Sequence, residues 1–139
     1  RSGGASEPAE QLGDIVHAFG LVSVQIDVDG SLPDDAHVAA AFLQIIREAS
    51  TNATKHAQAH QVQVRLWQEV SDGGAIAHMT VSNDGAPAPV SYREGTGIPG
   101  MRHVAQNLGG TLEVHAAPPF TLAVSIPLNS NATVQRRSS

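Results

Sequence analysis

The chain has 139 residues, enough for one domain around a single hydrophobic core, which argues against a multidomain enzyme or a large barrel. Thirteen acidic side chains outnumber eight basic ones, the formal charge is -5, and no Lys- or Arg-rich stretch could follow a nucleic-acid backbone. The absence of Cys excludes disulfides and thiolate metal sites, and no apolar run is long enough to span a bilayer. We therefore expect a soluble piece of a longer protein that binds no nucleic acid.

Both ends of the chain have the composition of flexible segments. Residues 1–11 are small and polar and include Gly and Pro, and residues 129–139 hold Ala132 and Val134 as their apolar positions. The folded domain is therefore expected to span residues 12–128.

The first elements predicted are a strand and a long helix. Apolar and polar residues alternate over residues 22–28, which predicts a half-buried strand that ends at Gly30. Ser31 and Pro33 are typical of a helix start, and two carboxylates follow them. Apolar residues then recur every three or four positions, so we expect a helix over residues 35–57 with one face against a sheet.

The second half of the chain has the pattern of two hairpins around a loop and a short helix. Alternation over residues 61–66 and 75–81 predicts an antiparallel pair. The Gly- and Pro-rich residues 84–100 are long for a plain connection and indicate a functional loop, a lid. A short helix over residues 101–108 and two strands near residues 111–114 and 120–126 complete the set.

These elements predict an α/β fold. It is a two-layer sandwich in which about five mostly antiparallel strands form a mixed sheet and the helices cover one face.

Four polar residues share one stripe of the long helix, at the edge of its apolar face. Glu48, Asn52, Lys55 and His56 fall within an arc of roughly 100°. A solvated charge pair would explain Lys55 alone, but Asn is unfavourable inside a helix and needs a reason such as a ligand. Because magnesium prefers oxygen ligands, Asn52, placed beside the carboxylate of Glu48, is a candidate ligand for that metal.

Two further segments have features of a nucleotide site. Gly95, Thr96, Gly97, Ile98 and Gly100 lie just before the short helix, where free backbone N–H groups would receive phosphate oxygens. Taken alone, this Gly pattern is equally typical of a flexible turn. Asn83 ends a strand, and the period of two points its side chain toward the helices, where a base could lodge.

The order of these segments resembles the ATP-binding domain of bacterial sensor histidine kinases, in the superfamily of gyrase, the heat-shock chaperone ATPase and the mismatch-repair ATPase. REASTNATKHA at residues 47–57 looks like the family's N box in the nitrate-sensor-like subfamily. VSNDG at residues 81–85 looks like the first Gly box, and GTGIPGMRHV at residues 95–104 looks like the second. The resemblance covers about residues 12–128 and implies a Bergerat-type sandwich with an ATP lid between the Gly boxes.

The resemblance also implies roles for single residues. Asn52 would hold the Mg2+ that bridges the ATP phosphates, and Glu48 would be the catalytic base that polarises the phosphoryl-accepting imidazole. The remaining nucleotide-binding residues implied by the resemblance are Lys55, His56, Asn83, Gly85, Gly95, Thr96, Gly97, Ile98, Gly100 and Met101. Arg102 would add positive charge near them.

The implied function is that of a catalytic domain which supplies Mg-ATP for phosphorylation of a His on a separate dimerisation domain, and so acts indirectly on a response regulator. No segment with such a His is evident in this chain, so transfer would depend on that domain. The resemblance implies a cytoplasmic location and is compatible with a dimeric parent anchored at the inner face of the cell membrane.

Two departures from the family pattern keep alternatives open. Asn83 stands where the family usually has Asp, and Pro87 replaces the second Gly of the first Gly box. A degenerate nucleotide-binding or docking module of the same fold is one alternative. An anti-sigma-factor-type Ser kinase is the other.

Overall fold

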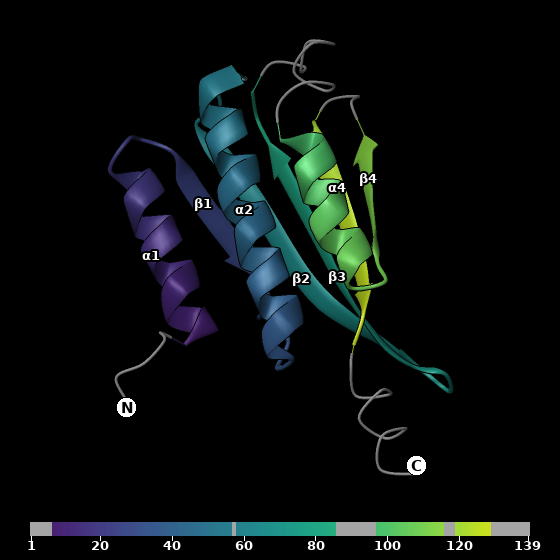
Figure 1. Cartoon of the computed structure of the whole chain (residues 1–139). Coiled ribbons are helices and arrows are strands. Elements are labelled where there is room, and N and C mark those ends of the chain that lie inside the picture. Colours follow the sequence, from purple (N-terminus) through teal and green to yellow (C-terminus); the bar gives the residue numbers. More distant parts are fainter. Residues whose placement is uncertain (1–6, 57, 86–96, 116–118, 129–139) are drawn as a thin grey trace.

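The computed structural model describes residues 7–56, 58–85, 97–115 and 119–128 (Figure 1). In chain order the elements are α1 (Pro8–Gly20), β1 (Gln25–Asp29), α2 (Ala36–His56), β2 (Gln61–Ser71), β3 (Gly74–Asn83), α4 (Ile98–Asn107), β4 (Thr111–His115) and β5 (Thr121–Pro127). The predicted lid over residues 86–96 lies outside the described residues.

The strands form one sheet of five, in the order β1-β2-β3-β5-β4. β1 pairs in parallel with β2, and every other pairing is antiparallel. The helices α1, α2 and α4 all lie against the same face of this sheet (Figure 1). The predicted two-layer sandwich with a mostly antiparallel sheet is confirmed.

The core lies between the helices and this face of the sheet. On β2 the residues Val62, Val64 and Leu66 are buried, and the polar residues between them face away. On α2 the side chains of Phe42 and Ile46 are fully buried. Since every second residue of a strand faces the helices, the predicted alternation places the apolar residues of the sheet in this core.

The long helix begins one residue after the predicted start. Asp35 Oδ1 accepts hydrogen bonds from the backbone N–H groups of His37 at 2.9 Å and Val38 at 3.1 Å, the arrangement of a helix N-cap. Asp35, rather than Ser31, therefore caps α2. The predicted end of this helix, near residue 57, agrees with the observed end at His56.

Two features of the N-terminal part differ from the prediction. α1 was not predicted, and it begins at Pro8, inside residues 1–11, which were assigned to a flexible terminus. It buries Ile15 and packs against α2 and β1. β1 begins at Gln25 rather than near residue 22, because Leu21 and Val22 belong to a turn and are 74% and 60% exposed. Ser23 in that turn has φ 69, which a strand residue does not adopt.

The described helices include none that is long and apolar enough to cross a bilayer.

Candidate nucleotide site

The polar stripe predicted on the long helix is present in the second half of α2. Asn52 is 4% exposed, and it is one of two polar residues in the described chain that are buried at this level. Glu48 lies one turn earlier and is exposed, as is Lys55 in the last turn. His56 is the final residue of α2. The stripe therefore runs from a buried amide to exposed charged groups.

Gly97 brings the second Gly segment against this stripe. It has φ 81 and is the N-cap residue of α4. A Cβ added at Gly97 would lie 2.6 Å from Glu48 Oε2 and 2.9 Å from Asn52 Nδ2, so these side chains fill the space that any other residue would need. Two segments 45 or more residues apart in the sequence thus meet, as the site hypothesis requires.

Among the described residues, nothing accepts a hydrogen bond from two backbone donors in the first turn of α4 at this contact. Pro99 has no N–H, and the N–H of Met101 donates to Gly97 O at 2.8 Å, so Ile98 and Gly100 carry the remaining donors of this turn. The helix dipole adds partial positive charge there. A turn of this kind can receive an anion, and phosphate binding at Gly97 and Gly100 stays a prediction.

Ile98 and Met101, both predicted as nucleotide-binding residues, have buried side chains. Both side chains are 2% exposed and belong to the hydrophobic core. They anchor the first turn of α4, and since the N–H of Met101 is already bonded, Met101 offers no donor to a phosphate. Gly95 and Thr96, also predicted as site residues, lie outside the described residues.

The side chain of Arg102 is hydrogen-bonded to β4. Its Nε donates to the backbone O of Leu112 at 3.2 Å. The guanidinium charge is therefore fixed next to β4.

Asn83 ends β3 on the helix-facing side of the sheet. The preceding alternate residues Met79 and Val81 are buried, and Asn83 is half-buried. Its Oδ1 accepts the N–H of Gly85 at 2.8 Å, and its own N–H donates to Phe120 O at 3.2 Å. Backbone and side chain are thus both fixed at the predicted base position, and Gly85 acts here by holding the amide.

Asp84 has a structural role that the sequence did not disclose. Its Oδ1 accepts the N–H of His60 at 2.9 Å and of Gln61 at 3.0 Å, and its N–H donates to Gln61 O. These hydrogen bonds, from Gln61 above all, lower the pKa of the Asp84 carboxyl. Asp84 therefore ties the end of β3 to the start of β2.

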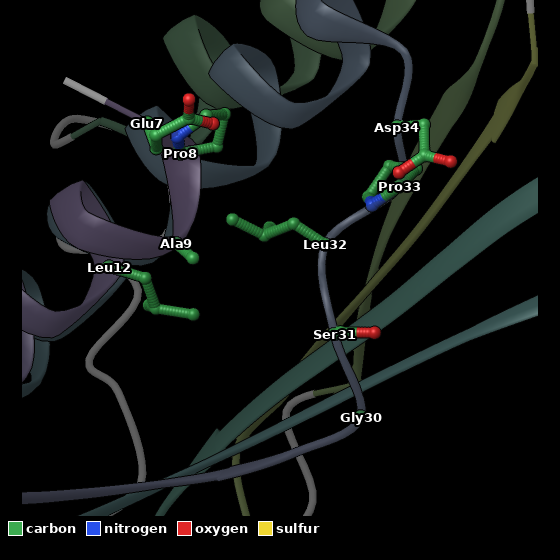
Figure 2. Close-up of a pocket in the computed structure, with 9 residues that line it drawn as sticks. All are labelled: Glu7, Pro8, Ala9, Leu12, Gly30, Ser31, Leu32, Pro33 and Asp34. Carbon is green, nitrogen blue, oxygen red and sulfur yellow. The ribbon is translucent and has the colours of Figure 1, made fainter. Parts of the chain in front are cut away.

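A hollow of about 350 Å³ lies elsewhere, between the start of α1 and the segment that joins β1 to α2 (Figure 2). Figure 2 shows the side chains of Leu12 and Leu32 turned toward one another across it. Its charged lining residues are Glu7 and Asp34, both acidic, which would repel phosphate. None of the predicted site residues lines this hollow.

Comparisons with known proteins show which ATPases and sensor kinases the chain is similar to. Residues 37–130 match the family described as "Histidine kinase-, DNA gyrase B-, and HSP90-like ATPase", which is more than half of the chain. The nitrate/nitrite sensor protein NarQ of Escherichia coli is 36% identical over 111 residues, 78% of this chain and 19% of that protein. The sensor histidine kinase MctS of Rhizobium johnstonii is 30% identical over 126 residues, 84% of this chain and 26% of that protein.

Solved structures show the same fold. The blue-light activated histidine kinase of Erythrobacter litoralis superposes with a TM-score of 0.64 and 26% identity, covering 88% of this chain and 42% of that one. The chain spans about a quarter or less of the length of the curated relatives named above.

Proposed function

Because the chain belongs to the family of histidine kinase-, DNA gyrase B- and HSP90-like ATPases, we propose that it is the ATP-binding catalytic domain of a two-component sensor histidine kinase. The contact of Gly97 with Glu48 and Asn52 is the observation that carries the proposal. It joins an amide and a carboxylate to an anion-receiving helix start, which is what a metal-bound triphosphate needs.

The phosphates of ATP bind at the start of α4. The N–H groups near Gly97 and Gly100 and the dipole of α4 receive the phosphate oxygens, together with Gly95 and Thr96. Lys55 and His56, at the end of α2, supply further contacts to the phosphates or shape the pocket. Glycine is favoured at position 97 because φ is in the left-handed region and an added Cβ would displace the buried amide of Asn52.

The residues present fit a Mg2+ ion that arrives with the nucleotide. The described residues hold no group of three or more His, Asp or Glu side chains that could bind a metal by themselves. Mg2+ commonly keeps waters and binds one or two protein oxygens together with substrate phosphates. Asn52 would supply such an oxygen, and the ion would neutralise charge that develops on the γ-phosphate.

Phosphoryl transfer uses a His on a separate domain. A nitrogen of that imidazole attacks the γ-phosphorus, the bond from this phosphorus to the β–γ bridging oxygen breaks, and ADP leaves with the electron pair. Glu48 polarises the imidazole by accepting a hydrogen bond from its other N–H. Its exposed position suits this role, since the acceptor must approach from outside.

The base binds beside Asn83. The half-buried amide lies on the helix-facing side, at the end of a strand whose preceding alternate residues are buried. Buried polar groups of this kind give a pocket its selectivity, because an unmatched partner leaves them without hydrogen bonds.

The proposed partners follow from the same assignment. The His-bearing dimerisation domain of the same kinase receives the phosphoryl group, and a response regulator receives it next. The domain works in the cytoplasm, at the inner face of the membrane if the parent is membrane-anchored.

Calorimetric titration of the 139-residue chain with ADP, with and without Mg2+, tests the proposal. We expect binding that Mg2+ strengthens, a loss of at least roughly tenfold in Asn52→Ala, and a smaller loss in Asn52→Asp, which keeps an oxygen ligand. Asn107→Ala, at the far end of α4, is the control. Absence of heat at millimolar Mg-ADP with a folded wild-type chain would reject nucleotide binding and favour a docking module.

A further inference from the structure

The carboxylate of Glu48 lies against the start of α4, in the space that the side chain of an N-cap residue would use. A Cβ added at Gly97 would meet Glu48 Oε2 at 2.6 Å and Glu48 Cγ at 3.2 Å. Because Gly97 has no side chain, a carboxylate from α2 reaches the first turn of α4. The N-terminal end of a helix attracts negative charge, and here that charge comes from the chain itself.

The charge of Glu48 has no partner within the part of the chain that the structure describes. Both ion pairs among those residues join a His to a Glu on the sheet, and none of those residues donates a hydrogen bond to Glu48. Arg102 of α4 is hydrogen-bonded to the backbone of β4 instead. Among these residues, no cation therefore neutralises the carboxylate beside the backbone donors of Ile98 and Gly100.

The phosphates of a nucleotide and the carboxylate of Glu48 would compete for this space at the start of α4. Both are anions, and two like charges at contact distance repel one another more strongly as water is excluded from between them. A Mg2+ ion carried by the nucleotide offsets part of the phosphate charge and so reduces the repulsion. The cost therefore falls mainly on nucleotide that arrives without its metal.

We propose that Glu48 selects the metal-bound form of the nucleotide, because its carboxylate opposes phosphates whose charge no cation offsets. The inference rests on the proposed function, since the phosphates are those of the same nucleotide. Glu48 is exposed, so its side chain can turn outward when Mg-bound phosphates occupy the first turn of α4. Turned outward, it faces the side from which the acceptor imidazole approaches, as its proposed role in transfer requires.

Calorimetric titration of the 139-residue chain with ADP, once with Mg2+ and once with a chelator, tests this selection. Glu48→Gln keeps the shape of the side chain and removes its charge. We expect this variant to bind metal-free ADP roughly tenfold more tightly than the wild type does, and Mg-ADP within about threefold of it. The ratio of the metal-free to the Mg-bound dissociation constant should therefore fall by at least about threefold.

Two controls separate electrostatic repulsion from other effects of the substitution. Glu10→Gln makes the same change of net charge on exposed residue 10 of α1, which α2 separates from α4 (Figure 1), so it should leave the ratio unchanged. A rise in salt from about 0.05 M to about 0.5 M should shrink the difference between wild type and Glu48→Gln, because salt screens exposed charges. A difference caused by altered packing would not respond to salt in this way.

Three results would overturn the inference while the proposed function stands. The first is a ratio that is the same in the wild type and in Glu48→Gln. The second is weaker binding of Mg-ADP by Glu48→Gln, which would make Glu48 a ligand of the metal. The third is that both proteins bind Mg-ADP and neither binds metal-free ADP at millimolar concentration. If the folded wild type binds ADP under neither condition, the proposed function fails and the inference fails with it.

Discussion

Asn52 and Gly97 lie against one another, although Asn52 is near the end of α2 and Gly97 is the N-cap residue of α4. Asn52 Nδ2 lies 2.9 Å from the position of a Cβ on Gly97. Asn52 is buried and Gly97 has φ 81, so neither can easily move to make room for a larger side chain. This contact sets the distance between the metal-binding amide and the phosphate-binding turn that we propose.

Replacement of Gly97 by Ala should therefore affect both stability and binding. The exposed Glu48 can swing aside, but the buried Asn52 and the left-handed backbone remain, which we expect to cost about 1–3 kcal/mol of unfolding free energy. Displacement of Asn52 should weaken Mg-ADP binding at least roughly tenfold. Urea unfolding and calorimetry measure the two effects.

Gly100→Ala is the matched control for Gly97→Ala. A Cβ at Gly100 meets nothing within 4 Å, and the substitution keeps the backbone N–H. Stability and Mg-ADP affinity should therefore stay within about 0.5 kcal/mol of wild type. Equal losses of stability and affinity in both variants would show that the contact of Gly97 with α2 is not their cause.

The carboxyl of Asp84 should make stability depend on pH in the acid range. Because folding lowers its pKa, the unfolded chain binds more protons there, and stability rises with pH through this window. The contribution is complete above about pH 3.9, the ordinary value, and is lost as pH falls through the lowered folded value.

Asp84→Asn tests this dependence without a change of shape. At pH 7 the variant should be less stable, by less than about 1 kcal/mol because the carboxylate is solvent-exposed. The gap between wild type and variant should shrink as pH falls below about 3.9, measured by urea unfolding at several pH values. A gap that stays constant down to pH 2 would contradict the assignment. Asp72→Asn, in the exposed turn after β2, is the control.

Ser50 is a buried polar residue whose replacement should stabilise the fold. It is fully buried, and its Oγ has no hydrogen-bond partner among the described residues. Ser50→Ala removes that unpaired hydroxyl and raises helix propensity, so we expect a gain of about 1 kcal/mol in unfolding free energy. Thr54→Ala should lose stability instead, since Thr54 Oγ1 donates to the backbone O of Ser50 at 2.8 Å. A loss of stability in Ser50→Ala would show that the hydroxyl is paired.

Most of the fold follows from hydrophobic periodicity, and the errors have local physical causes. The sheet face of α2 and the alternation on β2 and β3 are long and regular, so they fix the element type directly. α1 was missed altogether, because residues 1–11 were assigned to a flexible terminus on their small polar composition and the helical spacing of Leu12, Ile15 and Phe19 was not recognised. β1 was placed too early because exposed Val22 continued an alternation that the turn at Ser23 breaks.

The site was predicted in part. The spacing of Glu48 and Asn52 on one helix and the glycines before the next helix were sufficient to suggest that they meet. The packing of Gly97 on the two side chains depends on tertiary distances, which no local pattern contains. The hydrogen bonds that Asp84 accepts from His60 and Gln61 could not be predicted either, since these partners lie more than twenty residues earlier in the chain.

Gly30 should be the most sensitive glycine at the edge of the sheet. It has φ 98, and a Cβ there would collide with the backbone O of Leu66, which belongs to a paired strand and cannot turn aside. The strain of a left-handed backbone at residue 30 and the overlap of the new Cβ with the backbone of Leu66 add to one another. Gly30→Ala should therefore lose about 3 kcal/mol or more of unfolding free energy.

Gly13→Ala is the opposite case and serves as its control. Gly13 lies inside α1 with nothing within 4 Å of its added Cβ, so the variant should gain about 0.5–1 kcal/mol from helix propensity. Thermal and urea unfolding of the two variants measure the contrast. A Gly30→Ala protein as stable as wild type would mean that β1 leaves the sheet before Gly30 reaches Leu66, whereas a destabilised Gly13→Ala would mean that α1 is not helical at that position.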